Sequence, residues 1–350
     1  MEPAIVAGLH SHPELPKDIN VVACNSTLGN LLRLIRRQNK SFRILVILVD
    51  QTLFLIRREN SPTEIMQDVR GFGHTFPKAY TTWGPDVTQS ESHQRLLRYA
   101  FGDLQLLVRF EADGYLPQSH DKAIQQVQSR PKTNDHFDVN ILTESFKTSE
   151  ILSEGDPAIV SSTSDKLDVQ QAGDVVSQSS IFDLKTRIMK KKDHEILSGE
   201  IPRLWVAHIS NFVVAYHERG MFKPENINIQ NVSWDIAKWE KDKNSELAQL
   251  VALLHSLIYK AREKETGRFE MFKSEGGNLE LRRTLADAGD ALSAGVKKKW
   301  LRSSEATSMG SEKVDLKGTM TVGVLAWEDA QNSDYTACSD ACNYCGSCTY

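Results

Sequence analysis

Two apolar, strand-like runs that are each interrupted by a pair of charged residues constrain the fold of this chain more than any other feature. The first, "LQLLVRFEADGYL", contains Glu111 and Asp113, and the second, "SIFDLKTRI", contains Asp183 and Lys185. Alternate residues of a strand point to one face, so each run places its charged pair on one face. Charges beside buried apolar positions are costly unless cations or hydrogen-bond donors compensate them. We therefore expect two central strands that share a functional site.

The chemistry that suits such a pair of strands is metal-dependent cleavage of a phosphodiester. Clustered carboxylate oxygens are the ligands that Mg²⁺ or Mn²⁺ requires, so Glu111, Asp113 and Asp183 are candidate ligands, with the backbone carbonyl of Leu184 completing the shell. A metal-bound water would attack phosphorus, and Lys185 would position it or neutralise the developing charge. The competing interpretation is solvated charge on exposed strand faces. The apolar flanks favour buried strands with a function.

Composition limits the other function classes. The chain has 350 residues and a net charge of −4, so no overall basic field indicates nucleic acid, and such binding requires a local patch. The longest apolar run, "ILVILVD", is too short to cross a bilayer, and the N-terminal residues lack the basic segment of a signal peptide. We expect an intracellular protein, nuclear or cytoplasmic, that does not enter a membrane.

The periodicity of apolar residues predicts a mixture of helices and strands. Helical spacing predicts helices over residues 27–38, 90–102 and 201–211, and a long helix or helix pair over 234–264. Runs rich in β-branched residues predict a hairpin over 42–60 and a strand over 212–220. The fold class is therefore α/β or α+β.

The order of these motifs resembles the PD-(D/E)XK nuclease superfamily and, more closely, the DXO-like family of decapping exoribonucleases, as a divergent, fungal-type member. Glu111 and Asp113 match that family's Glu-x-Asp element, and the Asp183–Lys185 segment matches its Glu-Φ-Lys element. "GFGHTFPKAYT" occupies the place of the upstream G-Φ-x-F-E element, and His208 stands where a Trp-x-x-Gln helix has its glutamine. The resemblance covers roughly residues 70–220.

This resemblance implies a mixed central sheet flanked by helices, Mg²⁺ or Mn²⁺ as cofactor, RNA as partner, and decapping or 5′–3′ exoribonuclease activity at RNA 5′ ends. Lys185 and His208 would be the catalytic residues. The departures weaken that expectation, because Pro77 replaces the upstream glutamate and Asp183 is shorter than the family's acid. The alternative is a catalytically weakened nuclease fold that binds RNA or another protein.

A basic segment follows the second carboxylate-bearing strand. Its candidate contacts to a nucleic-acid 5′ end are Arg187, Lys190, Lys191, Lys192 and Arg203. Such side chains neutralise phosphates in protein–nucleic acid complexes. An ordinary solvated loop is an equally good interpretation of the same residues.

The C-terminal segment "CSDACNYCGSCTY" contains Cys338, Cys342, Cys345 and Cys348. Two overlapping C-x₂-C steps can bring thiolates to one zinc ion or to an iron–sulfur cluster. The alternative is an oxidisable tail without metal. A bound metal there would favour a structural role or a protein partner over catalysis.

The same observations divide the chain into four parts. We expect a loose N-terminus over residues 1–25, a nuclease-like domain over 26–265 with a polar insertion at 117–179, a helical extension and linker over 266–333, and a cysteine-rich tail over 334–350. The insertion is assigned because its composition provides too little apolar area for a core.

Overall fold

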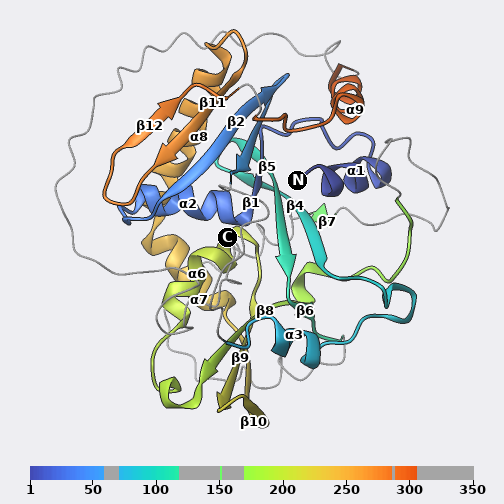
Figure 1. Cartoon of the computed structure of the whole chain (residues 1–350), viewed down its shortest axis with the longest axis vertical. Helices are drawn as coiled ribbons and strands as arrows, with labels where there is room; N and C mark the ends of the chain where they lie inside the picture. Colours follow the sequence, from blue (N-terminus) through green and yellow to red (C-terminus); the bar gives the residue numbers. More distant parts are fainter. Residues whose placement is uncertain (59–70, 118–149, 152–168, 286–287, 306–350) are drawn as a thin grey trace, which may run out of the picture.

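The computed structural model describes residues 1–58, 71–117, 150–151, 169–285 and 288–305 (Figure 1). Its strands are β1 (Val21–Cys24), β2 (Phe42–Val49), β3 (Thr52–Arg57), β4 (His93–Phe101), β5 (Leu104–Ala112), β6 (Gly114–Tyr115), β7 (Glu150–Ile151), β8 (Ile181–Ile188), β9 (Asn211–Glu218), β10 (Met221–Asn231), β11 (Arg268–Lys273) and β12 (Leu279–Arg282). Its helices are α1 (Glu2–Ser11), α2 (Asn25–Ile35), α3 (Thr75–Tyr80), α6 (Leu197–Val206), α7 (Ser233–Asp242), α8 (Asn244–Arg262) and α9 (Ala294–Glu305), with short 3₁₀ turns η1 (Pro85–Val87), η2 (Gln178–Ser180) and η3 (Met189–Lys191).

The strands of the described residues form two sheets. The larger has the order β12-β11-β2-β3-β1-β5-β4-β7, and the smaller has the order β10-β9-β8-β6. In the larger sheet β1 is parallel to both β3 and β5, whereas its other strand pairs are antiparallel. The predicted α/β class, with a mixed central sheet flanked by helices, is confirmed.

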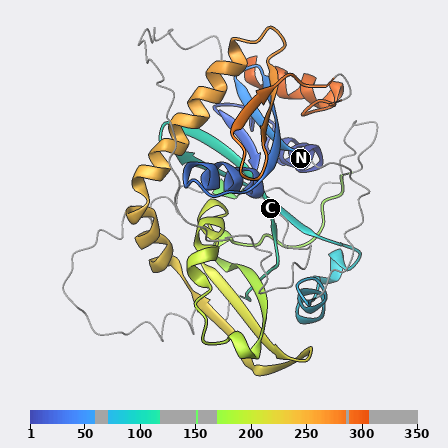
Figure 2. The same ribbon diagram turned by 60° about the vertical axis from the view of Figure 1, so that its left-hand side comes forward.

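Helices cover both faces of the larger sheet, as Figures 1 and 2 show. The short central strand β1 is buried on both faces: Val21 and Ala23 belong to the core beneath α2, α6 and α8, and Val22 belongs to the core beneath α1 and α9. A strand covered on both sides reads as a continuous apolar run rather than an alternating one. That burial makes β1 the structural centre of the larger sheet.

The smaller sheet also has two different faces. One packs Phe182 and Leu184 of β8 and Val213 of β9 against Phe76 of α3. The other presents Phe212, Val214 and Tyr216 of β9 to the main core. Because β8 and β9 are parallel and in register, the side chains of Asp183, Lys185 and Arg187 share this second face.

The predicted loose N-terminus is wrong for most of its length. Residues 2–11 form α1, and residues 21–24 form the central strand β1. Pro3 lies in the first turn of α1, where the missing amide hydrogen has no helical partner to lose. Ile5 and Val6 are buried against the larger sheet, which stabilises this helix through tertiary packing.

Two further sequence predictions are corrected. Residues 93–101 form β4 rather than a helix, and a tight turn through Gly102, with φ of +62°, joins β4 to β5. Leu97 pairs with Val108 and Tyr99 with Leu106, so cross-strand packing outweighs the helical spacing of the segment. Within the expected helical extension, residues 268–273 form β11, which pairs with β2 in the larger sheet.

The hairpin, the helix at residues 27–38 and the pair α7 and α8 are confirmed. Most of the predicted polar insertion and the four tail cysteines lie outside the described residues. Among the described residues, no helix is long and apolar enough to cross a membrane.

Candidate functional site

The chain passes from the larger sheet to the smaller one at Asp113, the single residue between β5 and β6. β6 pairs with β8 through Gly114 opposite Phe182, and this pairing brings Asp113 beside β8. Asp113 Oδ2 accepts a hydrogen bond of 2.6 Å from the backbone N–H of Leu184. The two carboxylate-bearing strands predicted from sequence therefore do meet, at the junction of the sheets.

Helix α6 covers the charged face of β8 and adds two charged side chains. Glu200 and Arg203 lie one turn apart on α6, and Arg203 Nη2 donates a 2.9 Å hydrogen bond to Glu200. The two Nη atoms of Arg203 also donate to the two carboxylate oxygens of Asp183. This bidentate geometry is the strongest form of an arginine–carboxylate contact.

The remaining cations of β8 approach Glu200. Lys185 Nζ lies 3.8 Å and Arg187 Nη2 lies 3.9 Å from its carboxylate oxygens. Asp183, Lys185, Arg187 and Glu200 are each at most 9% exposed. We refer to these four residues together with Arg203 as the charge network. Buried charges require such partners, since an isolated ion in the interior would be strongly destabilising.

The pKa values of Asp113 and Glu200 shift in opposite directions. Burial raises the pKa of Asp113 to about 7, and the neighbouring Asp183 carboxylate adds to this rise, against the opposing Leu184 amide hydrogen bond. Burial also disfavours ionisation of Glu200, but Lys185 and Arg203 outweigh it and lower the pKa of that carboxyl. Glu200 is therefore a compensated carboxylate, whereas Asp113 is an acid that is crowded by a like charge.

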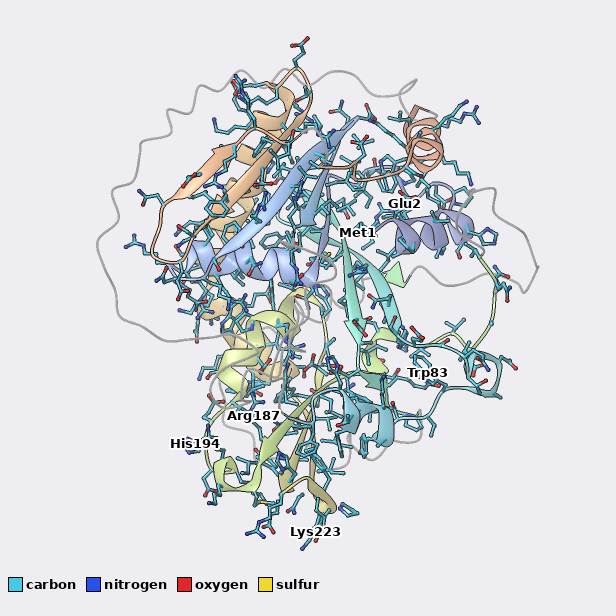
Figure 3. The ribbon with its side chains drawn as sticks, in the orientation of Figure 1. Met1, Glu2, Trp83, Arg187, His194 and Lys223 are labelled. Carbon is cyan, nitrogen blue, oxygen red and sulfur yellow. The ribbon has the colours of Figure 1, made fainter. Side chains whose placement is uncertain are left out.

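The other residues that the sequence predicted for the site lie outside the charge network. Glu111 is exposed near the end of β5, opposite Gln94 of β4. His208 follows α6 and its ring lies 4.2 Å from that of Tyr99; burial lowers the pKa of His208 to about 4. Lys190 and Lys192 are exposed at the end of β8. Figure 3 shows Arg187 at the smaller sheet and His194 near the surface beyond it.

The donor set does not match the metal site that the resemblance implies. Both oxygens of Asp183 accept from Arg203, Glu111 is exposed, and Pro77, at the place of the upstream glutamate, lies within α3. Among the described residues, no group of three or more His, Cys, Asp or Glu side chains is arranged to hold a metal ion. Asp113 and Asp183 remain as an adjacent carboxylate pair next to the Leu184 backbone.

Sequence reasoning missed Glu200. Its signal was present, because Glu200 precedes Arg203 by three residues at the start of a helix with an apolar face. The residue lies directly before the segment from which that helix was predicted. The positions of its partners on β8 were not deducible from local pattern.

Comparison with known protein families covers most of the chain, including the charge network. The family model described as "Domain of unknown function (DUF8563)" matches residues 5–278. The chain belongs to this family. No curated protein matches the sequence of this DUF8563 member.

Solved structures show which known fold the DUF8563 member has. Rai1 of Scheffersomyces stipitis, in complex with (3′-NADP)⁺ and a calcium ion, matches with a TM-score of 0.53 at 12% identity, over 85% of this chain and 77% of Rai1. Candida albicans Rai1, in complex with pU5 and Mn²⁺, matches with a TM-score of 0.50 at 11% identity, over 81% and 76% of the two chains. The predicted resemblance to the decapping exoribonuclease family is thus confirmed at the level of the fold.

Proposed function

We propose that this protein binds the phosphorylated 5′ end of RNA with a nuclease-derived fold and does not hydrolyse it. The observation that carries the proposal is the bidentate contact between Arg203 and Asp183. It engages both oxygens of a predicted metal ligand with a permanent cation of the protein itself. The RNA 5′ end is proposed because a Rai1 of the same fold was solved with pU5.

Two features of the site suit a phosphate. The side chain of Arg187 is buried, and its Nε–H has no hydrogen-bond partner within the described residues. A phosphate oxygen that reached this buried donor would satisfy it. Lys190 and Lys191 lie in η3, which follows β8 directly, and Lys192 comes next; these lysines would extend the contact along the RNA backbone.

Metal-dependent hydrolysis of RNA 5′ ends is the second candidate, and one observation favours it. Asp113 and Asp183 are adjacent, and their repulsion contributes to the raised pKa of Asp113. A divalent cation such as Mn²⁺ or Mg²⁺ relieves repulsion of this kind. Because Arg203 already compensates the charge of Asp183, we rank metal-dependent hydrolysis below RNA binding.

One set of experiments separates the two functions. Fluorescence anisotropy should show tighter binding of a 5′-monophosphorylated RNA than of the same RNA with a 5′-hydroxyl, with affinity falling as salt rises. Replacing Lys190, Lys191 and Lys192 together by glutamine should weaken binding and flatten the salt dependence. The matched control replaces Lys297, Lys298 and Lys299 of α9 by glutamine, which removes the same charge elsewhere.

The same RNAs, together with triphosphorylated and capped forms, should yield no product when incubated with Mn²⁺. Product that requires Mn²⁺ and disappears in Lys185→Ala would establish the second candidate instead. Equal binding of the phosphorylated and hydroxyl RNAs would contradict both candidates, since each requires recognition of the 5′ end.

A further inference from the structure

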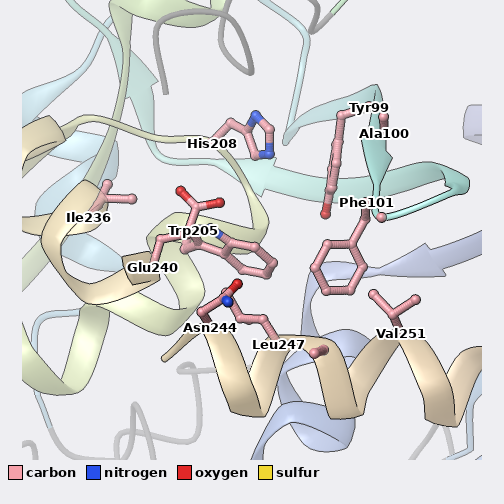
Figure 4. Close-up of a pocket in the computed structure, with 12 residues that line it drawn as sticks. Tyr99, Ala100, Phe101, Trp205, His208, Ile236, Glu240, Asn244, Leu247 and Val251 are labelled. Carbon is pink, nitrogen blue, oxygen red and sulfur yellow. The ribbon is translucent and has the colours of Figure 1, made fainter. Parts of the chain in front are cut away.

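A concave site lies beside α6, and none of the charge network residues lines it. It is a cavity of about 440 Å³ between the β4–β5 turn and the helices α6, α7 and α8 (Figure 4). Ligand pockets in proteins have volumes of about 300–1,000 Å³, so this cavity has room for a nucleoside-sized molecule. Ala100, Gly102, Asn244 and Ala248 of its lining are exposed, which leaves one side open to solvent.

The walls of this pocket are aromatic and aliphatic. Phe101 of β4 and Trp205 of α6 meet edge to face, with ring centroids 5.3 Å apart. Leu247 and Val251 of α8 complete the apolar part of the lining. Such surfaces favour a flat ring, because aromatic side chains provide large contact area and defined stacking geometry.

Three polar side chains converge on the same space: Glu240 from α7, Asn244 from α8 and His208 from the end of α6 (Figure 4). Burial raises the pKa of Glu240, and a hydrogen bond from the Trp205 side chain opposes that rise. Burial also keeps His208 neutral, because its pKa falls to about 4. A few fixed polar groups in an apolar pocket are the arrangement that gives a small-molecule site its specificity.

Glu240 decides the chemistry of the ligand. A carboxylate accepts at about four lone-pair sites, and the Trp205 side chain uses one of them. The carboxylate therefore has capacity for two parallel N–H donors from a ring that rests against Phe101 and Trp205. Guanine has two such adjacent donors, at N1 and at the exocyclic N2, whereas adenine presents one donor beside an acceptor.

We propose that this pocket binds a guanine base, with Glu240 accepting from its N1–H and N2–H groups. The inference is independent of the proposed function, since none of the charge network residues lines the pocket. Asn244 and the neutral ring of His208 are placed to contact the remaining polar edge of the base or the sugar.

Isothermal titration calorimetry of the full chain with GMP, IMP and AMP tests this proposal. GMP should bind, IMP should bind roughly tenfold more weakly because it lacks the N2 donor, and AMP should not bind measurably. Affinity of AMP equal to that of GMP, or failure of GMP to bind at millimolar concentration, would overturn the proposal.

Two variants and a control locate the binding. Glu240→Gln should lose at least tenfold in GMP affinity, because an amide cannot accept two N–H bonds in parallel. Ala248→Trp, at an exposed position of the lining, should fill the pocket and abolish binding without altering the core. The control variant is Asp242→Asn, which changes an exposed acid of α7, the helix that carries Glu240, and should leave the GMP affinity unchanged. Undiminished GMP binding by Glu240→Gln would refute the assignment.

Discussion

Replacing Arg203 by methionine tests whether this guanidinium occupies the role of the cation at the candidate site. The substitution keeps an extended side chain on α6 but removes both contacts to Asp183 and the 2.9 Å hydrogen bond to Glu200. Asp183 is 2% exposed, so solvent does not replace the lost partner. Lys185 and Arg187 remain near Glu200, at 3.8 and 3.9 Å.

Removing one partner from a buried ion pair destabilises a protein by about 3–5 kcal/mol, because an uncompensated charge stays inside. We expect a loss in this range for Arg203→Met at neutral pH, measured by urea unfolding with an unchanged m-value. The matched control is Arg282→Met, whose pair with Glu280 is 42% and 50% exposed. An exposed pair contributes about 0–1 kcal/mol, so this variant should unfold close to the wild type.

The second measurement repeats the unfolding in Mn²⁺. Without Arg203, Asp183 loses its ion-pair partner, and Asp113 and Glu200 each lose one of the cations near them, so a divalent ion that binds only the folded state should restore stability. At a concentration one hundred times its Kd, such an ion stabilises by about 2.7 kcal/mol. We expect this gain in Arg203→Met and little gain in the wild type. Equal stabilisation of the two proteins by Mn²⁺ would refute the argument that Arg203 takes the metal's place.

Three further predictions concern titration and packing. The lowered pKa of His208, about 4, makes the folded state resist protonation, so this side chain alone costs about 2 kcal/mol of stability as pH falls from 7 to 5. Asp113 acts in the opposite direction over the same range, so the free energy of unfolding of His208→Gln is compared with that of the wild type at each pH: this difference should rise by about 2 kcal/mol from pH 7 to pH 5, and a constant difference would contradict the prediction. The pKa of Asp113 is raised from 3.8 to about 7, so its contribution is favourable while the folded carboxyl is protonated and is lost as pH rises through that window. The urea midpoint of Asp113→Asn, relative to that of the wild type, should therefore increase as pH rises from about 5 to about 7, and a constant difference would count against it. Trp300→Ala should cost about 3–5 kcal/mol, because this fully buried ring contacts Phe54 and its indole donates to Thr52; a cost below about 1 kcal/mol would show that α9 is not part of the core.

The elements that could be predicted from sequence are those whose local pattern and tertiary role agree. The hairpin of β2 and β3 has continuous apolar runs on both sides of a turn, and α8 places Leu247, Leu250 and Leu254 on one buried stripe. β5 and β8 are predictable for the same reason, because each is a mostly apolar run that is buried along most of its length. The charged residues within these two runs mark the candidate site. Local preference and final environment point to the same structure in each case.

The elements that were misassigned are those whose structure depends on distant partners. β1 has only four residues, and it is a strand because β3 and β5 flank it on both sides. β4 has apolar residues at spacings that suit a helix or a strand, and its pairing with β5 decides between them. β11 belongs to the larger sheet through its pairing with β2, about two hundred residues earlier in the chain. Periodicity within one segment carries no information about such pairings.

The partners of the charged residues at the candidate site also depend on residues that are distant in the sequence. The sequence identified Asp113, Asp183 and Lys185 by residue type and spacing, but whether an acid is free to hold a metal depends on which cation reaches it. Arg203 was assigned to RNA phosphates, yet it contacts Asp183 and Glu200. Asp113 makes no such bidentate ion pair within the described residues, and burial, together with the neighbouring Asp183 carboxylate, raises its pKa. The asymmetry between these two neighbouring acids is therefore the structural basis for ranking RNA binding above hydrolysis: Asp183 is neutralised by the protein, and only Asp113 would gain from an added cation.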